Sequence, residues 1–232
     1  LEGYSTMGRE PFLAKVVWEN GWPVVNPGVG MLTDEVEIDL PAWDPKADTA
    51  FDTTANCVPG SSRTYDFTAM RRLGGEFLTL RNPGNDLYVL DGEGLKLSFR
   101  SVTLKEKDSP SYICVRQQHH AFRSSVVFLP DHLTGGRRAG MALVQNNEYH
   151  LRVEACRVKA GIEAVVILCE GGKDRIVEKR LLSESAGETK EGIGLTLEVS
   201  GLEASVRYDT AETGLLCSHI DIRKLSTEAA GG

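Results

Sequence analysis

The feature that most constrains this chain is a long series of short apolar runs in which every second residue is polar. In Leu195-Thr-Leu-Glu-Val-Ser, for example, the apolar side chains recur at every second position. Successive residues of a β-strand point to opposite faces of a sheet, so this alternation predicts strands with one buried face and one solvated face. The runs predicted as strands begin at Tyr112, Ser125, Ala139, Tyr149, Ala164, Ile193 and Ala204.

Turn-forming residues separate these runs. The separators are Gly135-Gly136, Asn146-Asn147, Gly171-Gly172 and Ser200-Gly201. The Asn146-Asn147 pair predicts a tight hairpin, since Asn tolerates positive φ. Only residues Lys173 to Ser185 resemble a helix, and their flanking glycines favour a strand. Evenly spaced strands without helices predict an all-β sandwich or closed barrel, and they exclude a parallel α/β fold, which needs crossover helices.

The first quarter of the chain has a different character. Residues 12–18 predict a strand, and residues 19–25 predict its return as a hairpin. Residues 26–72 are rich in Pro, Asp, Thr, Gly and Ser and show little periodicity, which is typical of a linker or of surface loops. We therefore predict three parts: an N-terminal hairpin segment in residues 1–30, an irregular linker in residues 31–66, and a β-sandwich domain in residues 67–232.

The charge balance and the length of the apolar runs each argue against one class of partner. Lys and Arg total 26 and Asp and Glu total 33, for a net charge of −7, and the basic clusters are only pairs. Nucleic-acid binding draws its affinity from clustered Lys and Arg, so no nucleic-acid partner is predicted. No apolar run approaches the ~20 residues of a membrane-spanning helix, so no membrane partner is predicted either. No signal peptide is visible, and the localisation is left open.

Cysteine and histidine spacing predicts no metal site. Of the five cysteines, Cys114, Cys156 and Cys169 lie in apolar runs, where a free cysteine behaves as a small buried hydrophobe. No CxxC, HxH or HExxH spacing occurs. In a regular strand the neighbours His119 and His120 point to opposite faces, so they are not expected to bind one ion together.

The segment from Gly8 to Asn26 resembles the junction between two domains in glycoside hydrolase family 43, the family of β-xylosidases and α-L-arabinofuranosidases. It departs from the family pattern at Pro11 and Lys15. The matching positions are Gly8, Arg9, Glu10, Phe12, Leu13, Val16, Trp18, Gly21, Trp22, Pro23, Val24 and Asn26. Four later segments also resemble the family, and these are residues 78–83, 94–97, 115–122 and 139–150.

This resemblance implies a concanavalin A-like (jelly-roll) β-sandwich that follows a five-bladed β-propeller, with residues 1–30 as the end of the propeller and the interdomain hairpin. In the family the propeller carries an aspartate base, an aspartate that tunes pKa and a glutamate acid. These acids are expected before Leu1, and the family's closing strand is expected after Gly232. The implied partners are an N-terminal propeller and a xylan-derived or arabinose-containing oligosaccharide. No cofactor is expected; the fold often binds calcium, but no compact Asp/Asn cluster indicates it.

The resemblance also points to candidate sugar contacts. In the xylosidases of the family, a sandwich loop reaches over the propeller's active site and contributes an aromatic residue. Residues 117–122 are predicted as that loop, with Phe122 as the aromatic and His119 and His120 as its neighbours. Phe122 as a core residue at the start of a strand is an equally good interpretation.

Three other residues are candidates for carbohydrate binding. Tyr149 and His150 lie beside the predicted Asn146-Asn147 turn, and Arg116 has donors for a sugar hydroxyl. Trp18 and Trp22 are better interpreted as packing against a neighbouring domain than as stacking on sugar, because buried aromatics dominate interface energetics.

Three functional hypotheses follow. The chain is predicted to be a non-catalytic accessory domain of a family 43 xylosidase or arabinofuranosidase; an autonomous carbohydrate-binding (lectin-like) module and a purely structural sandwich are the alternatives. Glycoside hydrolysis needs two carboxylates whose environments separate their pKa values. The acidic residues Asp34, Glu35, Glu37 and Asp39 are predicted as a solvated surface instead, so the chain alone is expected to be inactive and to contain no catalytic residue.

Overall fold

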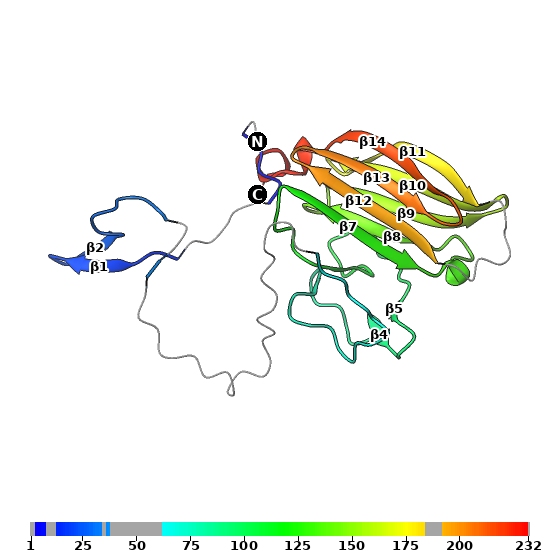
Figure 1. Ribbon diagram of the computed structural model, residues 1–232, viewed down its shortest axis with the longest axis horizontal. Helices are drawn as coiled ribbons and strands as arrows, with labels where there is room; N and C mark the ends of the chain where they lie inside the picture. Colours follow the sequence, from blue (N-terminus) through cyan, green and yellow to red (C-terminus); the bar gives the residue numbers. More distant parts are fainter. Residues whose placement is uncertain (1–2, 8–12, 34–35, 38–61, 184–191, 232) are drawn as a thin grey trace. The chain divides into compact units, whose positions relative to one another are not determined.

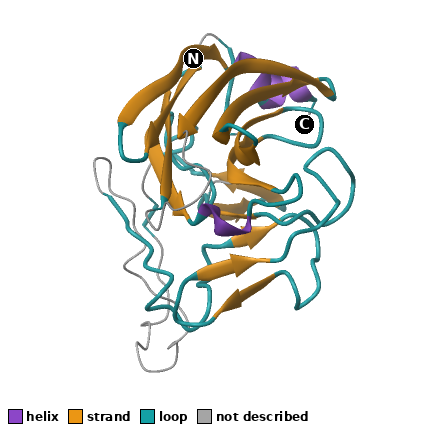
Figure 2. Ribbon diagram, turned by 90° about the vertical axis from the view of Figure 1, so that its right-hand side faces the viewer, coloured by secondary structure: helices purple, strands orange, loops and turns teal. Residues whose placement is uncertain are grey.

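A computed structural model describes residues 3–7, 13–33, 36–37, 62–183 and 192–231. Strands and loops make up nearly all of this part, and Figure 2 shows how short the helices are. The helical turns are η2 (Pro130–His132), η3 (Arg223–Leu225) and α1 (Thr227–Ala230). Within the described ranges no helix is long and apolar enough to cross a membrane.

The strands occur in three groups along the chain. The first group is β1 (Val16–Glu19) and β2 (Trp22–Val25). The second, of short strands, is β3 (Leu78–Thr79), β4 (Tyr88–Leu90), β5 (Leu95–Leu97) and β6 (Ile113–Cys114). The third is β7 (Ala121–Phe128), β8 (Arg138–Val144), β9 (His150–Val158), β10 (Gly161–Glu170), β11 (Lys173–Ser183), β12 (Ile193–Ser200), β13 (Glu203–Asp209) and β14 (Thr213–Asp221).

Contacts within the chain define two units. The larger comprises Leu1–Gly8 and Pro59–Gly232, and the smaller comprises Arg9–Val58. The predicted boundaries near residues 30 and 66 stay predictions. Of the acidic residues noted above, Glu37 is exposed, whereas Asp34, Glu35 and Asp39 lie outside the described residues.

In the smaller unit, β1 and β2 form an antiparallel hairpin in which Val17 lies opposite Val24. The two turn residues, Asn20 and Gly21, have φ values of 50° and 83°. Positive φ at both positions is the type I′ geometry that matches the twist of the flanking strands. The hairpin predicted for this part of the sequence is confirmed.

The larger unit is a sandwich of two four-stranded sheets, with strand orders β11-β10-β9-β8 and β14-β13-β12-β7. Figure 1 shows the two sheets lying one over the other. Every strand pairing in the two sheets is antiparallel. Two ribbons, β3-β6 and β4-β5, precede them in the chain. The predicted all-β sandwich is confirmed, and residues 173–183 of the segment that resembles a helix form strand β11.

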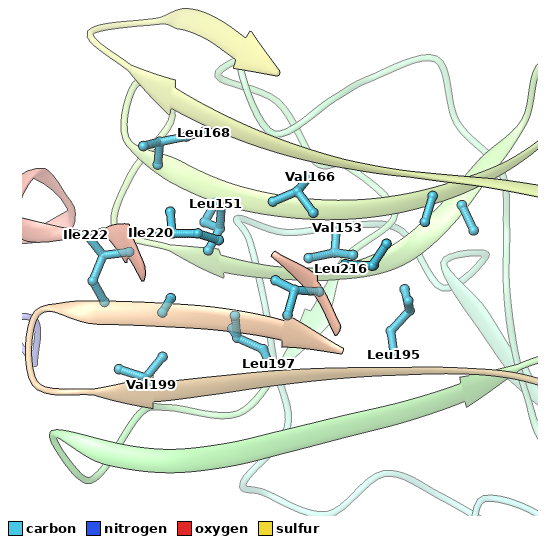
Figure 3. Close-up of a cluster of buried hydrophobic side chains, with 14 of the residues drawn as sticks. Leu151, Val153, Val166, Leu168, Leu195, Leu197, Val199, Leu216, Ile220 and Ile222 are labelled. Atoms are coloured by element: carbon cyan, nitrogen blue, oxygen red, sulfur yellow. The ribbon is translucent and has the colours of Figure 1, made fainter. Parts of the chain in front are cut away.

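The core lies between the two sheets and consists of the apolar half of each alternating run. On one sheet Val153 pairs with Val166, and on the other Leu197 pairs with Val206; all four side chains are buried. Figure 3 shows Val153, Val166 and Leu197 converging on this core from both sheets. A fully buried Leu or Val contributes about 1.5–3 kcal/mol relative to an exposed one, so this alternation is the main source of the sandwich's stability.

The turn between β8 and β9 differs from its prediction. Positive φ was expected at Asn146 and Asn147, but neither is among the described residues with positive φ. Instead, Oδ1 of Asn146 accepts hydrogen bonds from the backbone N–H groups of Glu148 (2.9 Å) and Tyr149 (3.0 Å). Asn closes the turn through its side chain, which mimics a backbone acceptor.

The N-terminal residues 3–7, called the strap below, lie beside the C-terminal helix α1 (Figure 1). The Ser5 N–H donates to Oε2 of Glu228 (2.8 Å), and the Thr227 N–H donates to the Ser5 carbonyl (3.2 Å). Ser226 caps the helix by accepting from the Ala229 N–H. These bonds join the two ends of the described chain.

Candidate functional site

The strand register aligns three chemically reactive side chains on the outer face of the β8–β11 sheet. Cys169 of β10 lies opposite His150 of β9 on one side and opposite Asp174 of β11 on the other. Directly paired residues of neighbouring strands point to the same face. One potential ligand atom from each residue lies within 4.8 Å of the others, so the three side chains form one cluster.

His150 is the most enclosed member of this cluster, with no exposed surface. Its Nδ1 lies 3.3 Å from the carbonyl oxygen of Asn146, and its Nε2 lies 2.7 Å from Nη1 of Arg152. A carbonyl only accepts, so Nδ1 carries the hydrogen, and the Nε2 lone pair accepts from the guanidinium. The imidazole is therefore neutral, in the Nδ1–H tautomer.

Arg152 joins the cluster to two carboxylates. Its Nη1 and Nη2 donate to the two oxygens of Asp174 (3.2 and 3.0 Å), and its Nε donates to Oε1 of Glu154 (2.8 Å). Nη1 of Arg138 binds the second oxygen of Glu154 (3.1 Å). Bidentate guanidinium–carboxylate pairs hold both partners in a defined orientation, so the four charges form a rigid network on this face.

The pKa values follow from this environment. Burial lowers the pKa of His150 below its ordinary value, and the charge of Arg152 lowers it further. Burial raises the pKa of the Cys169 thiol to about 11, and the neighbouring Asp174 carboxylate adds to the increase. Burial alone would raise the pKa of Asp174, but the hydrogen bonds and charge of Arg152 outweigh it and keep that pKa low. Asp174 is thus ionised while His150 and Cys169 are neutral at pH 7.

A loop from the preceding part of the sandwich unit covers this end of the sheet. Lys105 lies 3.6 Å from Asp174. Nδ2 of Asn147 donates to the carbonyls of Leu104 (3.1 Å) and Glu106 (2.6 Å). The loop 103–108 is therefore anchored to the β8–β9 turn and contributes a second cation to the cluster.

The structure separates the residues that the sequence proposed as sugar contacts. Phe122 and Tyr149 are partly buried and pack against the core between the sheets. His150 belongs to the outer-face cluster and is closed to solvent, whereas Arg116 is exposed between β6 and β7. These residues therefore do not form a common binding surface.

His119 and His120 lie in the loop before β7 and are both partly exposed. Their carbonyls accept from Nε2 of Gln117 (3.0 Å) and the N–H of Gly201 (2.8 Å), respectively. Gln117 Nε2 also donates to Oγ1 of Thr6 in the strap (3.4 Å). The loop is thus positioned by both the strap and the β12–β13 turn.

Sequence reasoning missed Arg152, Asp174 and Cys169 as a group with His150. Their positions along the chain contain no short spacing motif, because Arg152, Cys169 and Asp174 come from three different strands, β9, β10 and β11. The available signal was the alternation itself: His150, Arg152 and Glu154 occupy every second position and so share one strand face.

The two antiparallel sheets define a class of protein, the concanavalin A-like β-sandwiches. Residues 64–232 match the family described as the β-xylosidase C-terminal concanavalin A-like domain of glycoside hydrolase family 43. The chain belongs to this family.

The chain is similar over its whole length to two curated proteins and to a solved structure. The chain is 34% identical over 235 residues to a xylosidase/arabinosidase of Butyrivibrio fibrisolvens, covering all of this chain and 42% of that protein. It is 25% identical over 244 residues to the non-reducing end α-L-arabinofuranosidase BoGH43B of Bacteroides ovatus, covering 99% of this chain and 40% of that protein. The crystal structure of a GH43_12 protein from a capybara gut metagenome superposes with a TM-score of 0.76 at 21% identity, covering all of this chain and 43% of that one.

Proposed function

We propose that this chain is the accessory sandwich of a family 43 β-xylosidase or α-L-arabinofuranosidase, where it braces an N-terminal catalytic propeller and helps to shape the sugar pocket. The chain spans about two-fifths of the length of its curated relatives, 42% and 40%. Those relatives are named for xylosidase and arabinosidase activities, which supports a xylan-derived or arabinose-containing oligosaccharide as the substrate of the whole protein.

The observation that carries the bracing role is the β1–β2 hairpin. Trp18 is 72% exposed and Trp22 is 75% exposed. Trp18 lies opposite Pro23 and Trp22 lies opposite Glu19, so the two indole rings point to opposite faces of the ribbon. A two-stranded ribbon is at best marginally stable alone, and large exposed aromatic side chains mark interaction surfaces. Packing of both faces against neighbouring domains accounts for this arrangement.

The bracing role is tested in the full-length enzyme. Trp18→Ala and Trp22→Ala are expected to uncouple the two domains, so that calorimetric unfolding changes from one cooperative transition to two. Glu19→Ala in the same hairpin is the control and is expected to leave the single transition intact. One unchanged transition in both tryptophan variants would contradict the bracing role.

The loop 117–120 is the proposed contact with the sugar pocket, with His119 and His120 as its side chains and Phe122 anchoring it from the core. In the full-length enzyme, His119→Ala is expected to raise KM for nitrophenyl xyloside or arabinoside with little change in kcat, because it removes a binding contact that does not take part in the chemistry. The exposed neighbour Gln118 provides the control, as Gln118→Ala. Equal effects of the two substitutions would argue against the loop.

The accessory-domain proposal and its alternative, an autonomous carbohydrate-binding module, predict different results for the isolated chain. If the chain is an accessory domain, the 232 residues by themselves are expected to hydrolyse neither glycoside and to show no saturable heat on calorimetric titration with xylo-oligosaccharides. Saturable binding that is lost in the exposed-site variant Arg116→Ala would favour the module instead. Phe122 and Tyr149 are unsuitable probes because both pack against the core.

A further inference from the structure

We propose that His150, Cys169 and Asp174 form a binding site for a thiophilic divalent cation of the Zn²⁺ class, and that Arg152 is the internal cation that occupies the site in the metal-free protein. This inference is independent of the proposed function. It rests on the strand register, on the burial of His150 and Cys169 and on the position of one guanidinium.

The register brings together a donor set that suits such a cation. Imidazole nitrogen, thiolate sulfur and carboxylate oxygen are the three ligand types of protein zinc sites, at about 2.0–2.3 Å from the metal. Ligand atoms around one tetrahedral ion then lie about 3.3–3.8 Å apart. In this structure they lie within 4.8 Å of one another on three adjacent strands, so small side-chain rotations bring them to one ion.

The imidazole is already arranged as a ligand. The contact from Nδ1 of His150 to the Asn146 carbonyl (3.3 Å) leaves the Nε2 lone pair facing Arg152. A metal-ligating histidine usually donates its other N–H to a backbone carbonyl or carboxylate, which fixes the tautomer and ring orientation. The Asn146 carbonyl provides this support without further rearrangement.

Arg152 shows that the centre of the cluster attracts positive charge. Its Nη1 contacts both Nε2 of His150 (2.7 Å) and Oδ1 of Asp174 (3.2 Å). Both contacts are therefore to atoms that a metal ion would bind. When a metal enters, the guanidinium can turn away while keeping its bond to Glu154 (2.8 Å), so its charge stays paired.

Binding has two electrostatic costs. The Cys169 thiol must release its proton to solvent as the sulfur–metal bond forms, and Arg152 and Lys105 repel the incoming charge. We therefore expect weaker affinity than that of all-cysteine structural sites. A bound ion would join β9, β10 and β11 at one end of the sheet, so its expected role is to stabilise the sandwich and the β8–β9 turn.

The test uses the whole chain and Co²⁺, because a thiolate ligand gives cobalt a near-ultraviolet charge-transfer absorption. The natural sequence is expected to develop this absorption at one equivalent, and added Zn²⁺ is expected to abolish it by displacing cobalt and to raise the thermal midpoint. Cys169→Ser is expected to lose the absorption. Cys156→Ser is the matched control, since Cys156 is a buried cysteine on the same face of β9 as His150. This variant is expected to keep the absorption.

Two further variants make the result decisive. Arg152→Met removes the competing cation and is expected to tighten Zn²⁺ binding by about 10- to 100-fold, whereas Asp174→Asn at the partly exposed ligand is expected to weaken it by a similar factor. The proposal is overturned if the natural sequence gives no charge-transfer absorption, or if Cys169→Ser gives the same absorption. Binding only in Arg152→Met would also overturn it, because the guanidinium would then exclude metal from the natural protein.

Discussion

The guanidinium of Arg81 donates a 2.8 Å hydrogen bond to Oδ1 of Asn147, a residue 66 positions later in the chain. The second terminal nitrogen of the same guanidinium, Nη1, donates to the carbonyl of Asp108 (2.6 Å). Since Nδ2 of Asn147 donates to the carbonyls of Leu104 and Glu106, this one amide holds the loop 103–108 against the β8–β9 turn with both of its polar atoms.

Asn147→Ala is therefore expected to loosen that loop. Three hydrogen bonds are lost and the Leu104 and Glu106 carbonyls lose a partner, so a loss of about 1–3 kcal/mol is expected. Hydrogen exchange by mass spectrometry should show that residues 103–108 exchange faster in the variant than in the natural sequence, with a smaller change in the core strands. Asn85→Ala at an exposed position is the control, and equal exchange of residues 103–108 in the two variants would argue against the anchor.

Phe122→Ala is expected to act on stability. Phe122 lies opposite Val199 of β12, whose side chain is 3% exposed, and packs against the same core. Removing a buried Phe side chain typically costs about 3–5 kcal/mol, and partial exposure places this site at the lower end. Urea unfolding provides the measurement. Arg123→Ala on the opposite face should change stability by less than about 0.5 kcal/mol, and a similar loss in both variants would place Phe122 outside the core.

Gly140 of β8 marks a close approach of two backbones. A Cβ at this position would lie 1.9 Å from the carbonyl oxygen of Val153, and backbone atoms cannot move aside as a side chain does. Gly140→Ala is expected to push β8 from β9 and cost several kcal/mol, seen as a much lower thermal midpoint. Gly75→Ala is the matched control, because a Cβ there meets nothing within 4 Å. Comparable midpoints would show that the strands can separate without cost.

The strap should respond to acid. The hydrogen bond from the Ser5 N–H holds the pKa of Glu228 below its ordinary value of 4.5. Because the folded pKa is the lower one, the stabilisation is fully present above about pH 4.5 and is lost as pH falls through the folded pKa.

Amide exchange in residues 3–7 is the measurement for this effect, after correction for the intrinsic pH dependence of exchange. Protection of Ser5 is expected to fall in that acidic window. Glu228→Gln keeps an acceptor oxygen but cannot titrate, so its protection should be weaker and independent of pH there. A pH-dependent loss that persists in Glu228→Gln would assign the effect to another group.

Much of the fold was predictable because it depends on local alternation. Leu195, Leu197 and Val199 recur every second residue, and all three are buried in the core. The β1–β2 turn was likewise predictable from Asn20-Gly21, whose residue types tolerate the positive φ that the turn requires.

The candidate site was predictable only in part. His150 was identified as a candidate, but as a sugar contact. The cluster of His150, Cys169 and Asp174 depends on which residue of β10 lies opposite which residue of β9 and β11, and a shift of one position would send Cys169 to the other face.

The sequence by itself determined most of the long strands, the β1–β2 turn, the sandwich class and the family, because these follow from local backbone preferences, from alternating burial and from short motifs. Only the tertiary structure decided that Phe122 faces the core, that Arg152 lies within hydrogen-bonding distance of both His150 and Asp174, and that the strap joins α1. Those contacts join residues on different strands or at opposite ends of the chain. Their partners are set by strand register and packing, which no local pattern encodes.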